Sequence, residues 1–449
     1  MIFEREPRVI GRSAKRPTRN PRGRSRWATL MVGGLCLAAC GDGSTPATDG
    51  TGGGAGADPV AIELILTRPY YVPAGFVEAM LEKHAIELIV DLQPNDDILT
   101  RLQARKDAGQ PLPDLIGAED SFLMPAFAEA GFVGDHSAFR EQFAVEAPEV
   151  YEQLWDEVWT ETEGTGVSIT ANFDVFHYDV EWFEEAGVTA PFGSFDDVLD
   201  GMRALKATRP GSVPLAVQAR AGSGVTTLKT MLAGTGTPFD GAAPDLASAG
   251  GLYTCNWWVT AAREGLTPPD AAAWGEDEAR ASFAAGDAGL LLDGFSAAGD
   301  LREVEGFDSP DQWHSTPSPV TGGPAGTDGV AWSAARTWGI VEGTEHPYEA
   351  GLVIREIAST RWLLAQAAEG GVPARSQAMM DSPELLEIWP FFDEDLKAAY
   401  RAAEPQAAGG NADVVEAILE EFFAEIVSGQ STDCDDLVAR YQPRLDAAS

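Results

Sequence analysis

Histidine, serine and carboxylate side chains could perform chemistry in this chain, but their spacing matches no catalytic site. The five histidines are His84, His136, His177, His314 and His346, and no two stand at the spacing of zinc ligands. The segment at 294–299 (GFSAAG) is one residue longer than the Gly-x-Ser-x-Gly elbow of hydrolases. Because the chain has 70 Asp and Glu residues, carboxylate pairs arise by chance. The sequence therefore predicts no catalytic residue, metal or cofactor, and an enzyme is the least favoured function.

Side chains in loops after predicted strands are better candidates for binding than for catalysis. A small polar solute needs flat apolar surfaces and a few directional polar groups, and α/β sheets bind ligands just beyond their strand ends. By this rule, the candidates for ligand binding are Tyr70, Tyr71, Asp120, Asn172, Arg220, Trp257, Asp293, Phe295, Trp338 and Arg375.

Several of these candidates also have a purely structural interpretation. Tyr70 or Tyr71 could cover the end of a sheet, and Asp293 could cap the turn that follows it. Trp257 and its neighbour Trp258 could both belong to a hydrophobic core. The sequence leaves these alternatives open.

The first 39 residues have the pattern of a secretory signal. Nine basic and two acidic residues precede an apolar run at 27–39, which is shorter than the roughly 20 residues that span a bilayer. The run ends in LAAC (37–40), which matches the lipobox of bacterial lipoproteins and predicts an acylated Cys40. The alternative is an ordinary signal that happens to contain a cysteine. We expect an exported protein, anchored by lipid to the cell envelope in the periplasm or on the outer surface.

Residues 40–58 predict a flexible tether, since after Cys40 they hold almost no side chain larger than alanine that could enter a core.

The charge of the chain is strongly negative. The formal charge is −39, and it becomes −46 without the first 39 residues, which carry nine basic and two acidic groups. Such a field repels nucleic acid, so a nucleic-acid partner is not expected.

Two of the four cysteines are available for a disulfide. Cys36 leaves with the signal and Cys40 is the lipidation site, so Cys255 and Cys434 are left in an oxidising compartment. Their number permits a single disulfide, but their spacing alone does not decide between paired and free thiols.

The order of predicted strands and helices favours an α/β protein. Apolar strands are expected at 60–66, 86–92 and 113–118, with helices at 76–83, 96–109 and 122–129 between and after them. Asp96 is expected to cap the second of these helices. Because strands and helices alternate, we expect parallel sheets covered by helices.

The alternation resumes after residue 166. Extended segments are expected at 166–178, 213–217, 289–292 and 338–341. Helices are expected at 180–186, 194–205, 225–233, 276–285, 347–358, 360–369 and 411–428. Ser194 and Asp197 have the spacing of a capping box, and residues 315–329 are expected to form a connector. With about 390 residues after the tether, two lobes are expected.

Several segments, taken in order, resemble the family 1 extracellular solute-binding proteins of ABC importers, the group of maltose-binding protein. They are PDLIGAEDSFLMPAFAEAGFVGD (113–135), FHYDVEWFEEAGVTAPFGSFDDVLDGMRAL (176–205), FAAGDAGLLLDGF (283–295), TWGIVEGTEHPYEAGLVIREIAS (337–359) and GGVPARSQA (370–378). Two positions differ from the family pattern. Its Tyr-Asn pair is Tyr178-Asp179 here, and its Gly-Ser-Trp is Gly294-Phe295-Ser296, a site that often stacks on a sugar.

The resemblance implies a two-lobed, type II periplasmic-binding-protein-like fold with the ligand cleft between the lobes. Crossings are implied near 166–171, 316–322 and 366–372, which gives lobe 1 as 59–166 and 322–366, and lobe 2 as 167–321 and 367–449. Cys255 and Cys434 would then share lobe 2, and the lobes would close over the ligand by hinge motion.

The same resemblance implies a monomeric substrate-binding lipoprotein that delivers a small solute, with a carbohydrate favoured, to an ABC permease. The alternatives are a non-sugar solute and a surface sensor that feeds a receptor. Arg220 and Arg375 would favour an anionic solute if both line the cleft, although Arg375 could instead pair with a surface carboxylate.

Overall fold

The computed structural model describes residues 58–448, except for a set of short segments and the longer segment 143–165. The short segments are 68–70, 94–96, 119–122, 137–138, 140, 222–223, 238–242, 303, 305–306, 308, 310, 322, 324–328, 370–376, 391 and 406–411. The signal, Cys40, the tether up to residue 57 and Asp96 therefore lie outside the described residues. None of the helices in the described part of the chain combines the length and apolar character that a membrane crossing requires.

The first sheet contains the N-terminal strands and is mainly apolar on its buried side. Its strands are β1 (Val60–Leu66), β2 (Ile86–Leu92), β3 (Leu115–Ala118), β8 (Trp332–Ile340), β9 (Glu404–Pro405) and the first half of β4 (Val167–Asp179). β1 runs parallel to both β2 and β3, β8 runs antiparallel to β3 and β4, and β9 runs parallel to β8. The parallel arrangement that the alternation predicts is confirmed for β1, β2 and β3, whereas the antiparallel β8 makes the sheet mixed.

The second sheet is built around the other half of β4. That half pairs antiparallel with β6 (Ala288–Gly294) and with β7 (Trp313–Pro317), while β5 (Val213–Ala216) runs parallel to β6. Residues 315–329 were expected to be a connector, and that prediction is wrong for its first three residues. They belong to β7, because Ser315, Thr316 and Pro317 continue the pairing with β4.

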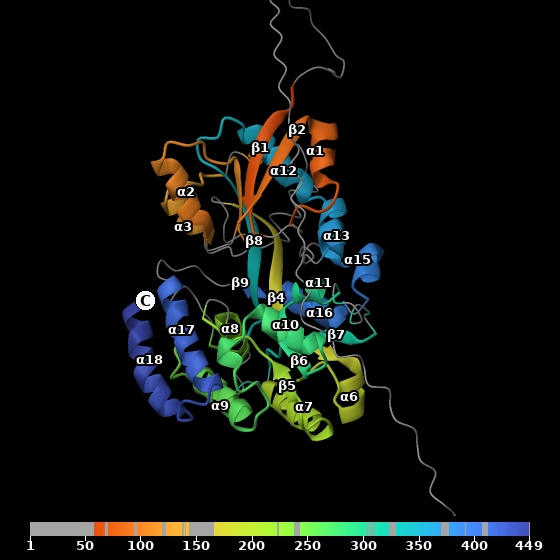
Figure 1. Ribbon diagram of the computed structural model, residues 1–449, viewed down its shortest axis with the longest axis vertical. Helices are drawn as coiled ribbons and strands as arrows, with labels where there is room; N and C mark the ends of the chain where they lie inside the picture. Colours follow the sequence, from red (N-terminus) through yellow and green to blue (C-terminus); the bar gives the residue numbers. More distant parts are fainter. Residues whose placement is uncertain are drawn as a thin grey trace, which may run out of the picture. The chain divides into compact units, whose positions relative to one another are not determined.

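The two sheets are joined by β4, and we call β4 and its partner β8 the ribbon. Figure 1 shows the two strands side by side, with β4 reaching both sheets. β4 pairs with β8 as far as Phe173, and from Asp174 onward it pairs with β6. The register between β4 and β8 shifts between Ser168 and Thr170, where β4 has a bulge. The change of sheet therefore falls between two neighbouring residues of one strand.

The helices cover both sheets. Those associated with the first sheet are α1 (Phe76–His84), α2 (Ile98–Asp107), α3 (Leu123–Glu129), α12 (Pro347–Ile357) and α13 (Thr360–Ala368). Those of the second sheet are α6 (Val180–Ala186), α7 (Phe195–Thr208), α8 (Val225–Gly234), α9 (Ala249–Arg263), the 3-10 helix η3 (Ala271–Ala273), α10 (Glu276–Ala284) and α11 (Ala297–Arg302). The C-terminal helices are α14 (Gln377–Met380), α15 (Pro383–Ile388), α16 (Glu394–Ala402), α17 (Ala412–Val427) and α18 (Cys434–Ala448).

Local sequence explains several of these boundaries. The Ser194 hydroxyl accepts a hydrogen bond from the Asp197 backbone N–H, which confirms the predicted start of α7. The Asp197 carboxylate accepts a hydrogen bond from the same hydroxyl at 2.9 Å. Asp179 accepts from the Trp182 N–H and so starts α6 directly at the end of β4.

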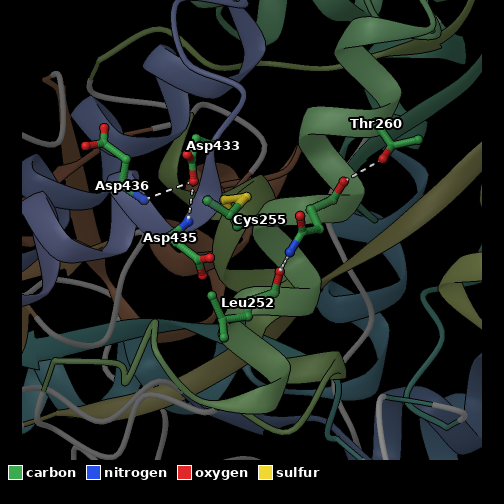
Figure 2. The surroundings of a disulfide bond; sticks show 8 residues. Leu252, Cys255, Thr260, Asp433, Asp435 and Asp436 are labelled. Carbon is green, nitrogen blue, oxygen red and sulfur yellow. Dashed lines mark hydrogen bonds between the residues drawn. A yellow bond between two sulfur atoms is a disulfide. The ribbon is translucent and has the colours of Figure 1, made fainter.

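A disulfide joins Cys255 and Cys434, the two cysteines for which the sequence permits one (S–S 2.04 Å). Cys255 lies in α9 and Cys434 is the first residue of α18 (Figure 2). Asp433 accepts hydrogen bonds from the backbone N–H groups of Asp435 and Asp436 and so caps α18 beside the bond. The disulfide therefore fixes a capped helix end against the core of the second sheet, which contains both cysteines.

Loss of this disulfide should destabilise the protein. The variant Cys255→Ala/Cys434→Ala should lose about 2–5 kcal/mol of unfolding free energy, because the bond closes a long loop in the unfolded chain. Urea denaturation of the oxidised full-length chain measures the loss. Each single variant should lose nearly as much as the double variant, since either one removes the same bond. If the losses of unfolding free energy in the two single variants add up to the loss in the double variant, this account is contradicted.

Candidate functional site

The two faces of the ribbon differ in chemistry. Because side chains alternate along a strand, Thr170, Asn172 and Asp174 of β4 share one face. Residues directly opposite each other in paired strands point to the same face. Thr170 is opposite Arg336 and Asn172 is opposite Ala334, so Arg336 lies on this face. Trp332 lies on it as well, because it is two residues from Ala334 along β8. We call the side chains of Thr170, Asn172, Asp174, Trp332 and Arg336 the polar face. It spans the point where β4 changes sheet.

The opposite face of the ribbon is packed with aromatic rings. Phe173 stacks on Tyr400 with the ring centroids 4.9 Å apart, and on Phe295 at 5.9 Å. Phe295 in turn contacts Trp389 and Phe392 edge to face. These rings are buried and fix the ribbon on one side. The polar groups are therefore confined to the other side.

Polar contacts reach the polar face from both sheets. The Arg336 Nε–H donates to the Tyr71 hydroxyl at 2.6 Å, which connects β8 to the segment after β1. The Asn172 amide donates to the Ser296 hydroxyl and accepts from the Ser296 backbone N–H, each at 3.2 Å. These contacts hold Arg336 and Asn172 in place on the two strands.

A buried ion pair lies next to the same face. Lys229 of α8 is 2% exposed and its ammonium pairs with Glu416 of α17. The ammonium also lies 5.7 Å from the centroid of the Trp332 ring. The pair therefore connects α8 to α17 beside the ribbon, and removing Glu416 would leave the buried charge of Lys229 uncompensated.

Three polar atoms of the polar face are buried without a hydrogen-bond partner among the described residues. They are Thr170 Oγ1, Asp174 Oδ1 and Trp332 Nε1. An unsatisfied buried polar atom costs about 1–3 kcal/mol, so native proteins keep few of them. Two are able to accept a hydrogen bond and one is a donor only. This combination fits a partner that both donates and accepts, as a hydroxyl group does.

Asp174 is a titratable group of the polar face whose pKa is strongly raised. It is 3% exposed, and burial raises the pKa of its carboxyl to about 7. The Thr230 hydroxyl donates a hydrogen bond to Oδ2 and opposes this shift. Asp293 and Glu276 raise the pKa further, whereas Arg336 lowers it. The group therefore titrates close to neutral pH.

His177 lies on the opposite face of β4 and has a structural role. Its Nε2–H donates to the Gly294 carbonyl at 3.2 Å, and its Nδ1 accepts from the Ser315 hydroxyl at 2.8 Å. Burial lowers the pKa of the imidazole to about 4, so the ring is neutral at physiological pH. Within the described residues, no group of three or more His, Cys, Asp or Glu side chains is arranged to hold a metal ion.

Two predicted ligand residues take part in this arrangement and two others are engaged elsewhere. Tyr71 and Asn172 contact or belong to the polar face. Asp293 is 3% exposed, accepts two hydrogen bonds from Arg280 at 2.8 and 3.1 Å, and also accepts one from the Gly294 N–H. Arg220 is exposed and pairs with Glu278 at 3.3 Å.

Three predicted ligand residues are core residues. Trp257 is 4% exposed and donates its indole N–H to the Phe195 carbonyl, because it lies in α9 and not in the loop from which it was selected. Phe295 is fully buried in the aromatic cluster, and Trp338 of β8 packs beside Gly117. We do not carry these three into the proposed site. Tyr70, Asp120 and Arg375 lie outside the described residues.

Asp174, Trp332 and Arg336 are not among the residues predicted from the sequence. A signal for two of them was present, because Asp174 and Arg336 are charged residues inside apolar, strand-like segments (FDVF and WSAARTWGI). A charge at such a position must find a partner in the fold. The pairing of β4 with β8, which brings these residues to one face, could not be read from either segment alone.

Two cavities lie away from the polar face. One, of about 410 Å³, is lined by residues of the α6–α7 connection and α7, including Phe192 and Asp197. The other, of about 420 Å³, lies beyond the end of β8 and is lined by His136, Phe139 and Tyr348 among others. None of the five residues of the polar face lines either cavity.

Known proteins similar to this chain are found through a family model and through solved structures. The family model of the bacterial extracellular solute-binding proteins matches residues 66–363. A sequence search of curated proteins finds no significant match.

Solved structures of low sequence identity share the fold. Maltose-bound MalE3 of T. maritima has 18% identity and a TM-score of 0.72, covering 87% of this chain and 100% of its own. The GacH receptor of Streptomyces glaucescens, solved unliganded and with acarbose, has 15% identity and a TM-score of 0.70, covering 86% and 98%. The ABC transporter solute-binding protein of Agrobacterium radiobacter K84 in complex with ribitol has 14% identity and a TM-score of 0.71, covering 87% and 99%. These similarities establish the two-lobed α/β fold.

The raised pKa of Asp174 should make stability depend on pH. In the unfolded chain the pKa of an Asp carboxyl is about 4. Since the folded state holds the proton up to about pH 7, the stability contributed by the protonated group is lost as the pH rises from about 4 to about 7. Relative to Asp174→Asn, the wild type should therefore lose thermal stability across this interval.

Melting temperatures at half-unit steps from pH 4.5 to pH 8 measure the effect. The control is Asp287→Asn, which removes an equal charge from an exposed residue just before β6 and should keep the pH dependence of the wild type. Curves for the wild type and Asp174→Asn that stay parallel over the whole range would contradict the assignment.

Proposed function

Because the chain belongs to the bacterial extracellular solute-binding proteins, we propose that it captures a small carbohydrate between its two lobes and delivers it to an ABC importer. We place lobe 1 at 59–166 and 322–366, and lobe 2 at 167–321 and 367–449. The protein is proposed to act as a monomer that releases its solute chemically unchanged. Closure of one lobe on the other would bury the solute.

The observation that carries the solute class is the set of buried polar atoms on the polar face that have no hydrogen-bond partner among the described residues. Thr170 Oγ1, Asp174 Oδ1 and Trp332 Nε1 together offer acceptors and a donor within a buried surface. A sugar hydroxyl both donates and accepts, so one ligand can satisfy both kinds of atom. The ring of Trp332 adds a flat apolar surface of the kind on which the C–H side of a sugar packs.

Residues from both sheets support a site at this position. Tyr71 and Arg336 are associated with the first sheet, whereas Ser296 and Thr230 contact the polar face from the second. We propose that Tyr70, Asp120 and Arg375, which lie outside the described residues, also contact the solute. The similar structures hold maltose, acarbose or ribitol, all of them polyhydroxyl compounds.

Thermal stability in the presence of sugars tests the proposed solute class. Maltose, tagatose or ribitol at about 100 times its Kd should stabilise the folded protein by ~2.7 kcal/mol, because a ligand that binds only the folded state shifts the unfolding equilibrium. Recovery of the unchanged compound from the complex would support binding without turnover.

Two variants locate the bound sugar. Asn172→Ala should remove most of the sugar-dependent shift, since it removes the amide from the polar face. Asn256→Ala is the matched control, because Asn256 is exposed on α9 and its amide contacts the Leu252 carbonyl. A wild-type protein that no neutral mono- or oligosaccharide stabilises would contradict the carbohydrate proposal. A shift with acidic sugars only, abolished by Arg220→Glu, would favour an anionic solute.

We further propose that the mature protein is anchored to the envelope through an acylated Cys40. The family is extracellular, and the basic flank, short apolar run and LAAC sequence support export followed by lipidation.

Cys40→Ala should move the protein from the membrane fraction to the soluble fraction of an expressing bacterial cell. Cys36→Ala, four residues away within the predicted signal, is the control and should leave it with the membranes. If the Cys40→Ala variant stays in the membrane fraction with its signal still attached, the uncleaved signal is what anchors it. If the variant has lost its signal and still stays in the membrane fraction, the lipid anchor is contradicted.

A further inference from the structure

The two carboxylate oxygens of Asp174 differ in their hydrogen bonding. Oδ2 accepts a hydrogen bond from the Thr230 hydroxyl of α8, while Oδ1 is buried and has no partner among the described residues. The side chain as a whole is 3% exposed. Since Asn172 and Arg336 lie on the same face, the unused oxygen belongs to the surface that we propose for the solute.

Charged groups of β8, β6 and α10 act on Asp174, and a charged side chain of α8 lies nearby. Arg336 of β8 favours the ionised carboxylate, whereas Asp293 of β6 and Glu276 of α10 disfavour it. Lys229 of α8 directs its ammonium to Glu416 of α17. The Arg336 Nε–H is engaged by the Tyr71 hydroxyl. Burial outweighs these influences, so the carboxyl changes its charge near neutral pH.

We propose that Asp174 accepts a hydroxyl hydrogen of the solute through Oδ1, and that its ionisation makes solute affinity depend on pH. This inference rests on the proposed function and deepens it. It assigns to the site a neutral polyhydroxyl solute, and it makes a residue deep in the ribbon responsible for the strength of capture.

The direction of the pH effect follows from the hydrogen bond. An ionised carboxylate accepts a hydroxyl hydrogen roughly twice as strongly as a neutral acid does. The bound solute therefore favours the charged form and lowers the pKa of Asp174, so binding releases protons when it occurs below the pKa of the free protein. Affinity should be higher above about pH 7 than below it. A difference of about 1.4 kcal/mol in one such bond corresponds to tenfold in Kd, so we expect a change of about three- to tenfold.

The inference also separates classes of solute. A neutral sugar or polyol offers the hydroxyl that the carboxylate accepts. A solute with its own carboxylate would be repelled once Asp174 is charged, so its affinity should fall as the pH rises. The sign of the pH dependence therefore reports the class of solute at this position.

Isothermal titration calorimetry on the full-length protein tests the inference. Maltose, tagatose and ribitol are the probes, and Kd is measured from pH 5.5 to pH 8.5. Titrations in two buffers of different ionisation enthalpy count the protons released. The wild type should bind about three- to tenfold more tightly at pH 8 than at pH 6, with proton release at pH 6. Asp174→Asn should bind with a Kd that does not vary with pH, and Asp287→Asn should behave as the wild type.

Each outcome decides between the proposals. A wild type that binds a probe with the same Kd at all pH values, without proton release, would overturn this inference and leave the carbohydrate function in place. The same pH profile in the wild type and in Asp174→Asn would also overturn it. If no probe binds at any pH, the proposed function fails and this inference falls with it. Since the wild-type profile and the proton count need no variant, the test holds even if Asp174→Asn does not fold.

Discussion

The antiparallel pairing of β4 with β8 is the constraint on which the rest of the structure depends. β4 gives its first half to one sheet and its second half to the other, so a single continuous strand belongs to both. The backbone hydrogen bonds on either side of Phe173 and Asp174 then fix which side chains meet at the change of sheet. A residue added to β4 near this point would turn every following side chain to the opposite face. Core and site are therefore set by the same register.

The two faces of the ribbon have complementary roles. The aromatic cluster around Phe173 and Phe295 immobilises one face, as close packing of rings does in protein cores. The polar face can therefore hold Asn172, Asp174 and Arg336 at defined positions. The rigid packing of the aromatic face supports the polar face, where buried polar atoms have no partner within the described part of the chain and a ligand can supply one. Helix α8 adds to this support, because the Lys229–Glu416 pair connects it to the C-terminal helices that the disulfide also fastens.

Much of the fold could be predicted from local sequence, whereas the site could not. Strands such as Val60–Leu66 and Ile86–Leu92 follow from short apolar runs, and Ser194 marks the start of α7. The number of cysteines permits the disulfide but does not establish it. The bond is established by the fold, which brings α9 and α18 together. Trp257 and Phe295 were selected for chemical type, but burial decides their role, and burial depends on contacts distant in sequence. Asp174 and Arg336 were overlooked because each is a single charge in an apolar strand, and their meeting depends on strands more than 150 residues apart.

A crystal structure of the protein with a bound neutral sugar tests the central claim most directly. The account predicts that the sugar lies against the polar face, with a hydroxyl group within hydrogen-bond distance of Asp174 Oδ1 and its ring near Trp332. It also predicts that Phe295 and Trp257 keep their core positions in the complex. A sugar bound elsewhere, with the polar face covered only by protein, would contradict the account.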